Sequence, residues 1–200
     1  ISHELRTPLT LILGPASYLL NNPNKFNKQT AIKTLKDISK NGNNLLQLIE
    51  EILDLSKLDA HKLELFEEEI HLQTFLRRIV LAFEPQAVYQ EIDFQFQFQA
   101  KDNLCVLLDL KKVEKVVNNL ISNAIKYTPP KGCIEILISE NVSNILLEVK
   151  DNGQGIHPDD LPHVFERFFQ TKQTSKIEQG GTGVGLALSI ELAQFMQGSL

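Results

Sequence analysis

The sequence lacks a signal peptide, and no apolar run in it approaches the roughly 20 residues that a membrane-spanning helix needs. Basic residues are not in excess either, because 20 Lys and Arg face 25 Asp and Glu and give a net charge of -5. This balance excludes a general nucleic-acid surface and a polybasic membrane patch, so an anionic ligand has to be held locally. The 42% hydrophobic content excludes a disordered chain and suits one sizeable core or two small ones in 200 residues.

Cysteine is also scarce, with Cys105 and Cys133 as the two examples. Both stand in apolar runs, without a CxxC partner and without a histidine at metal-ligand spacing in the sequence. We therefore expect two buried free thiols, which are typical of a protein from a reducing compartment.

Glycine is nearly absent from the first part of the chain. Only Gly14 and Gly42 precede residue 132, whereas seven of the ten glycines fall between Gly153 and Gly198. The two ends of the chain therefore have different backbone requirements, since glycine supplies tight turns and close backbone approach.

The N-terminal part of the chain has the spacing of a helical hairpin. Residues 1–20 carry a seam of apolar residues in alternating steps of four and three: Leu5, Leu9, Ile12, Ala16 and Leu19. Turn residues follow at 21–24, and a second run repeats the spacing: Leu35, Ile38, Gly42, Leu45, Ile49, Ile52 and Ser56. Two helices share too little interior to bury so wide a stripe, so we expect two chains to form a four-helix bundle.

The rest of the chain mixes helical and strand patterns. We expect helices over 72–89, 110–127 and 185–197, and strands over 92–98, 105–108, 134–139 and 145–150. Helices segregated onto an antiparallel or mixed sheet make an α+β domain.

The first chemical cluster is HELRTP at residues 3–8. The heptad places His3 and Thr7 on the solvent side, while Pro8 removes a helical hydrogen bond from Glu4 and predicts a bend. An exposed imidazole beside a carboxylate can act as a nucleophile. The metalloprotease pattern HExxH is excluded by Thr7. Taken alone, a histidine on a helix surface is more often inert.

The second cluster is a polar stripe on the helix 110–127. Asn119, Asn123 and Lys126 stand at i, i+4 and i+7, away from the apolar face. Two carboxamides and an ammonium suit phosphate oxygens and a hydrated Mg²⁺. A solvated helix face explains the same stripe equally well.

Glycine loops form the third cluster. DNGQGI at 151–156 follows a strand, where backbone can approach a ligand and Asp151 can accept from an adenine amino group. GGTGVGL at 180–186 leads into the last helix, whose free N–H groups favour phosphate. This loop matches neither the Rossmann motif, which needs a glycine at position 186, nor the P-loop motif, which needs a lysine there, because the residue is Leu186. Between these loops, VFERFF at 164–169 precedes a polar stretch, 170–179, that we expect to be mobile enough to fold over a ligand.

In their order along the chain, these clusters resemble the transmitter core of sensor histidine kinases of the two-component type. The resemblance covers nearly the whole sequence and consists of an H box (1–9, ISHELRTPL), an N box (119–129, NLISNAIKYTP), a G1 box (151–156), an F box (165–169, FERFF) and a G2 box (181–186). Five boxes in the family's order and spacing favour the functional interpretation of clusters that are ambiguous alone.

The resemblance implies two domains. Residues 1–62 would be the dimerisation and histidine-phosphotransfer hairpin, and 68–200 an α/β-sandwich ATP-binding domain of the Bergerat fold. The family fold continues past Gly198 with at least one more strand, so we expect the C-terminal strand to be truncated. The parent protein is expected to be a membrane-anchored bacterial sensor with this portion in the cytoplasm, although this segment itself would contact no membrane and no nucleic acid.

The resemblance also implies residue roles. His3 would be the phosphoacceptor, Glu4 the general base, and Thr7 a residue that helps place a water for dephosphorylating the partner. Asn123 would be the Mg²⁺ ligand. The ATP-binding residues would be Asn119, Asn123, Lys126, Tyr127, Asp151, Gly153, Gly155, Ile156, Phe165, Gly181, Thr182, Gly183, Gly185 and Leu186. The expected partners are a second copy of the chain and a response-regulator receiver domain, separate or fused.

Two features separate this chain from its relatives. Many family members carry an arginine directly after the F-box aromatics, where this chain has Gln170, and Arg167, Lys172 or Lys176 are the possible substitutes. Hydrolytic ATPases of the gyrase, Hsp90 or MutL kind carry a glutamate one turn before the Mg²⁺-binding Asn, where this chain has Asn119. The hydrolase interpretation is therefore disfavoured, as is a catalytically dead scaffold, because the boxes keep their polar residues.

Overall fold

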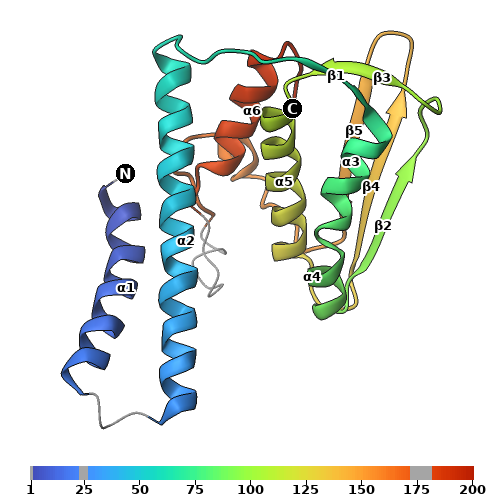
Figure 1. Ribbon diagram of the computed structural model, residues 1–200. Helices are drawn as coiled ribbons and strands as arrows, with labels where there is room; N and C mark the ends of the chain where they lie inside the picture. The colour runs from blue at the N-terminus through green and yellow to red at the C-terminus, as the bar shows by residue number, and fades with distance from the viewer. Residues whose placement is uncertain (1, 23–26, 172–181) are drawn as a thin grey trace. The chain divides into compact units, whose positions relative to one another are not determined.

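A computed structural model describes residues 2–22, 27–171 and 182–200 of the chain (Figure 1). The chain divides into two compact units, and the main division falls between Leu63 and Glu64. Among the described residues, no helix combines the length and the apolar character that crossing a membrane requires.

The first unit is the predicted helical hairpin. Helix α1 (Ser2–Asn21) runs antiparallel to α2 (Lys28–Asp59), as the ribbon shows (Figure 1). Pro8 and Pro15 both lie inside α1 without ending it. Helix α2 begins at a side-chain cap, because Asn27 Oδ1 accepts a hydrogen bond of 2.8 Å from the backbone N–H of Thr30. The connecting turn expected at 21–24 lies largely outside the described residues.

The predicted packing seam is only partly covered within one chain. Seam residues Leu9, Leu35 and Ile49 remain 44%, 57% and 41% exposed. Further apolar side chains on both helices are exposed as well: Leu11, Leu13, Leu20, Ile32, Leu46 and Leu53. A soluble helix rarely presents this much apolar surface without a partner to cover it.

The second unit is a sandwich of helices and strands, as the sequence predicts. Its elements in order are β1 (Glu68–His71), α3 (Leu72–Leu81), α4 (Glu84–Tyr89), β2 (Asp93–Phe98), β3 (Cys105–Leu108), α5 (Leu110–Tyr127), β4 (Cys133–Glu140), β5 (Ile145–Asp151), a short 3₁₀ turn (Leu161–His163) and α6 (Gly185–Phe195).

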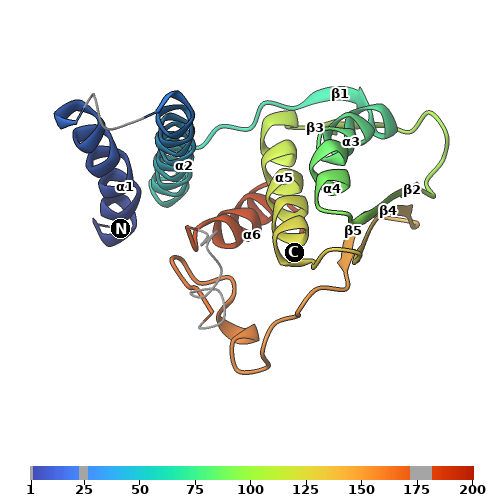
Figure 2. The ribbon, with the colours of Figure 1, turned by 90° about the horizontal axis from the view of Figure 1, so that it is seen from below.

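Two small sheets organise these elements. β1 pairs antiparallel with β3, while β2, β4 and β5 form a three-stranded sheet in which β2–β4 is parallel and β4–β5 antiparallel. Helices α3 and α5 cover one face of the larger sheet (Figures 1 and 2). The core between them is apolar, and Ile121, Ile125, Ile134, Ile136 and Ile138 are fully buried. The end of α5 and the end of β5 are thereby held in fixed positions.

Three local expectations were wrong or incomplete. The helix expected over 72–89 is two helices, since Pro85 lacks an N–H and its ring disfavours continuation from α3. Strand β1 went unpredicted, because only Ile70 of its four residues is apolar. Of the two cysteines expected to be buried, Cys105 is exposed and only Cys133 is partly buried, although both are free.

The Cys105 side chain has a partner that spacing along the chain could not reveal. Its Sγ lies 3.3 Å from Nδ1 of His71, because β1 and β3 pair in a register that places these two residues opposite each other. For Cys133, burial raises the pKa of the thiol, and the carboxylates of Asp93 and Glu135 act in the same direction.

Candidate functional site

Helix α5 carries the predicted polar stripe and is anchored at its first turn. Asp109 is 3% exposed and caps the helix, since its Oδ1 accepts a hydrogen bond of 3.1 Å from the backbone N–H of Lys112. Its Oδ2 accepts one of 2.9 Å from the backbone N–H of Phe66 and also contacts Lys112 Nζ. Burial alone raises the pKa of Asp109, but the hydrogen bonds from Lys112 and Phe66 outweigh it and lower the pKa below the ordinary range.

The structure distinguishes the members of the stripe. Asn119 Nδ2 donates to Oγ of Ser189, a buried residue of α6, at 2.8 Å. Asn123 is half-buried, and its carboxamide has no hydrogen-bond partner within the described parts of the chain. Lys126 lies over the ring of Tyr127, with 4.8 Å between Nζ and the ring centroid. Asn119 therefore ties two helices together, whereas the Asn123 carboxamide bonds to no described residue.

The first turn of α6 approaches α5 closely. A Cβ on Gly185 would overlap the side-chain carboxamide of Asn119, so the position requires glycine. Just before the helix, the backbone N–H of Val184 donates to Oγ1 of Thr182 at 3.3 Å. These contacts fix the N-terminus of α6, where backbone N–H groups and the helix dipole favour an anion.

The end of β5 meets the end of α5. Asp151 Oδ1 accepts a hydrogen bond of 2.9 Å from the backbone N–H of Gly153, while the residue itself is exposed. A Cβ on Gly153 would lie 2.5 Å from the backbone oxygen of Tyr127 and 2.7 Å from Asp151 Oδ1. Because Gly153 has no side chain, the end of β5 lies against Tyr127 at the end of α5.

Most of the other predicted nucleotide residues that the structure describes lie in loops. Gly155 and Gly183 both have a φ of +68°, a conformation that L side chains rarely adopt. Ile156 and Phe165 are 45% and 38% exposed. Leu186 is half-buried on α6, and Gly181 lies outside the described residues. The mobile stretch expected at 170–179 also lies almost entirely outside them.

Arg167 has a structural partner. Its Nε and Nη2 donate to the two carboxylate oxygens of Glu191 on α6, each at 2.9 Å. This bidentate pair holds the F-box segment against α6 and occupies the guanidinium that the sequence offered as a substitute for the arginine missing at Gln170. The other two substitutes, Lys172 and Lys176, lie outside the described residues.

The predicted phosphoacceptor segment lies in the other unit. His3, Glu4 and Thr7 belong to the first two turns of α1, with Glu4 half-buried and Thr7 exposed. The placement of Thr7 agrees with the heptad assignment that puts it on the solvent side.

Two supporting residues were missed from the sequence. Ser189 holds Asn119, and Asn152 joins the end of β5 to β4, because its Oδ1 accepts from the backbone N–H of Cys133 at 2.7 Å. Asn152 lies inside the G1 box, but only the pairing of β4 and β5 shows that its side chain is structural. No sequence spacing links Ser189 to Asn119, 70 residues earlier.

Comparison with known proteins identifies the protein family to which the chain belongs. Residues 1–61 match the family described as "His Kinase A (phospho-acceptor) domain", and residues 108–200 match "Histidine kinase-, DNA gyrase B-, and HSP90-like ATPase". The whole chain aligns at 36% identity over 203 residues with Histidine kinase P4 of Formosa agariphila and covers 15% of that protein.

Solved structures of histidine kinases are similar to this chain. The histidine kinase AdeS of Acinetobacter baumannii superposes with a TM-score of 0.74 at 25% identity, over 96% of this chain and 86% of that one. The full-length ShkA structure in complex with AMPPNP gives a TM-score of 0.69 at 25% identity, over 98% of this chain and 40% of that one.

The chain belongs to the histidine kinase family and has the transmitter core of a sensor histidine kinase, a helical hairpin followed by an ATPase domain. It spans a minor part of the relatives that it matches, 15% of the Formosa protein.

Proposed function

We propose that this chain transfers the γ-phosphoryl group of ATP to an imidazole nitrogen of His3 and then to an aspartate of a response-regulator receiver domain. In the first step a nitrogen–phosphorus bond forms, the bond from the γ-phosphorus to the bridging oxygen breaks, and ADP leaves. Glu4 accepts the imidazole proton. Thr7 helps to place the water that dephosphorylates the receiver.

The predicted nucleotide residues have side chains and backbone that fit a nucleotide. Asp151 has a carboxylate that would accept a hydrogen bond from the adenine amino group. The neighbouring Gly153 adds no side chain that would crowd the base. Ile156 and Phe165 offer exposed apolar surface for the base. Lys126 and Tyr127 lie at the end of α5. Thr182 and Gly183 lie just before α6 in the chain, and Gly185 and Leu186 begin it, so the phosphates would lie at this helix N-terminus. Gly155 has the positive φ of a tight loop, and the family resemblance assigns Gly181 to the nucleotide as well.

Magnesium fits the same site. The unpartnered carboxamide of Asn123 provides a neutral oxygen ligand, and Mg²⁺ keeps most of its waters and adds few protein ligands. A bound Mg²⁺ would neutralise charge on the triphosphate. Asn119, held by Ser189, would position α6 beside the phosphates.

The observation that carries the proposal is the chemistry at Asn119. A hydrolytic ATPase needs a base that activates water one turn before the metal ligand, and here that position holds an amide engaged with Ser189. The γ-phosphoryl group then needs another nucleophile, and the H box supplies His3 beside Glu4. We also propose a homodimer, because the exposed seam residues of α1 and α2 would pack into a four-helix bundle.

Incubation with γ-labelled ATP and Mg²⁺ tests the proposal. We expect protein-bound label that is lost in acid and retained in base, as for a phosphorylated imidazole, together with slow release of free phosphate. A receiver domain added afterwards should remove the label from the chain. Multiple turnovers of phosphate release without label on the protein would instead show a hydrolase.

A further inference from the structure

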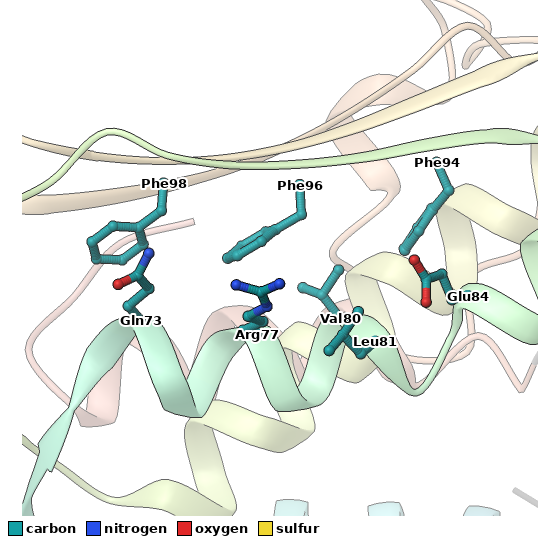
Figure 3. Close-up of a pocket in the computed structure, with 8 residues that line it drawn as sticks. All are labelled: Gln73, Arg77, Val80, Leu81, Glu84, Phe94, Phe96 and Phe98. Atoms are coloured by element: carbon teal, nitrogen blue, oxygen red, sulfur yellow. The ribbon is translucent and has the colours of Figure 1, made fainter. Parts of the chain in front are cut away.

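A second groove lies away from the proposed ATP site, between α3 and β2. Its volume is about 330 Å³, and it shares no residue with the nucleotide-binding set. Three phenylalanines of β2 form one wall: Phe94, Phe96 and Phe98. The other wall belongs to α3 and α4 and is partly polar and partly apolar: Gln73, Arg77, Val80, Leu81 and Glu84. Figure 3 shows the three rings projecting from the strand toward the helices.

Three pairs of side chains face each other across the groove. Phe98 lies opposite Gln73, Phe96 opposite Arg77, and Phe94 opposite Glu84 (Figure 3). Gln73 and Arg77 are four residues apart on α3, which is about 6 Å along the helix, and two residues of strand advance about 6.6 Å. Glu84 begins α4, seven residues after Arg77, and Val80 and Leu81 line the groove between them. The groove therefore has a cation near its centre and an anion at one end.

These charges are available to a ligand. Arg77 and Glu84 are exposed, and neither forms a hydrogen bond or an ion pair with another residue in the parts of the chain that the structure describes. The neighbouring Arg78 differs, since it lies 3.7 Å from Glu114 and over the ring of Phe75. The pattern of charge in the groove thus complements a segment with an acidic and a basic side chain two residues apart.

The strand that carries the phenylalanines also has an open edge. β2 pairs with β4 on one side, and no other strand of the described residues pairs with its second side. The backbone N–H groups of Asp93 and Gln99 donate to Gly132 and Ile138 on the β4 side. Because N–H groups alternate along a strand, those of Phe94, Phe96 and Phe98 point to the open edge.

We propose that this edge and groove bind an extended segment of a partner protein, which adds a strand to β2. The backbone of that segment would pair with the N–H and C=O groups of Phe94, Phe96 and Phe98. Every second side chain would enter the groove, with a carboxylate at Arg77 and, two residues away, a basic side chain at Glu84. The remaining side chains that enter the groove are apolar and pack against the phenylalanine rings.

The probe is an array of fluorescein-labelled, capped decapeptides in which threonine alternates with groove-facing residues. Most groove-facing residues are Val, Leu or Phe, and two of them, two positions apart, are one Glu and one Lys. Peptides with Glu before Lys and with Lys before Glu are both included, so that parallel and antiparallel pairing are sampled. We expect binding to the chain in fluorescence anisotropy, and slower hydrogen exchange at the amides of Phe94, Phe96 and Phe98. The amides of Gln95 and Gln97, which face β4, should not change.

Charge exchange gives the matched controls. Arg77→Glu should weaken binding of the selected peptide about tenfold or more, as loss of a charge-assisted hydrogen bond predicts. The same peptide with Glu replaced by Lys should recover affinity for that variant. Arg78→Glu should leave both affinities unchanged.

Four results would overturn the proposal. The first is that no peptide of the array binds, and the second is that a peptide binds but hydrogen exchange at the three phenylalanine amides is not slowed. The third is that wild type and Arg77→Glu bind the selected peptide with equal affinity. The fourth is that, without any peptide, exchange at those amides slows as the protein concentration rises. The last result would make a second copy of the chain the occupant. ATP binding by Arg77→Glu, measured in parallel, keeps this test separate from the test of phosphoryl transfer.

Discussion

Single residues without side chains decide how closely the walls of the nucleotide site approach. The Gly153→Ala substitution would bring a methyl group against the backbone oxygen of Tyr127, which cannot move away as a flexible side chain would. We expect this variant to lose about 1–3 kcal/mol of stability and to bind ATP at least ten times more weakly. Calorimetric titration and thermal unfolding measure the two effects.

Gly14 offers the matched control for this prediction. It lies in α1, and a Cβ there would meet no atom within 4 Å. Gly14→Ala should therefore raise stability by about 0.5–1 kcal/mol through backbone entropy and leave ATP affinity unchanged. An unaltered ATP affinity in Gly153→Ala would contradict the close approach of Asp151 and Tyr127.

Asn123 is the residue on which the Mg²⁺ proposal depends. Asn123→Ala should abolish Mg²⁺-dependent nucleotide binding without unfolding the protein, because its carboxamide supports no other described residue. Isothermal titration with and without Mg²⁺, alongside circular dichroism, provides the measurement. Asn118→Ala, which lies next to Asn119 on the same helix but outside the stripe, is the control. Equal Mg²⁺-dependent affinity in the two variants would refute the assignment.

At the scale of elements, the cap of α5 predicts a pH dependence of stability. Hydrogen bonds from Lys112 and Phe66 lower the pKa of Asp109 in the folded state, so the folded protein binds this proton less readily than the unfolded chain. The resulting stabilisation is complete above the ordinary aspartate pKa and disappears as the pH falls through the lowered value. We expect Asp109→Asn to cost about 1–2 kcal/mol at pH 7, because the hydrogen bonds from Lys112 and Phe66 would no longer be made to a charged group.

The difference between wild type and Asp109→Asn should shrink below about pH 4, where the unfolded carboxyl is protonated. Denaturant titrations at a series of pH values measure it. If the difference in unfolding free energy between the two proteins instead stays constant at acidic pH, the shape of the Asp109 side chain, and not its charge, stabilises the helix.

Elements with a long, regular apolar spacing were predictable from the sequence, and those that depend on distant partners were not. Helices α2 and α5 follow their periodicity, whereas the break at Pro85 was hidden because the apolar spacing continues on both sides. Strand β1 exists through its pairing with β3 across more than 30 residues. The side-chain partners Ser189 and Glu191 likewise depend on how α6 packs. The order of the motifs identified the family, whereas the local pattern left each cluster ambiguous.

At the scale of the whole molecule, the exposed seam of the hairpin predicts a dimer. Wild type should sediment as a dimer at micromolar concentration, because Leu9, Leu35 and Ile49 remain exposed in the single chain. Leu35→Asp should shift the protein toward monomer, since it places a charge in the apolar seam. Lys36→Asp, the next residue along α2, is the matched control and should remain dimeric. A monomeric wild type would contradict the four-helix bundle.

The central claim is that ATP bound in one unit phosphorylates a histidine in the other. The chain has five histidines, so acid-labile label alone does not identify the acceptor. The direct measurement is incorporation of label from γ-labelled ATP into His3→Gln and, as a control, into His163→Gln, whose side chain contacts Glu166 in the second unit. The account predicts label in the His163 variant, no label in the His3 variant, and equal ATP affinity in both. Label that persists in His3→Gln would contradict it.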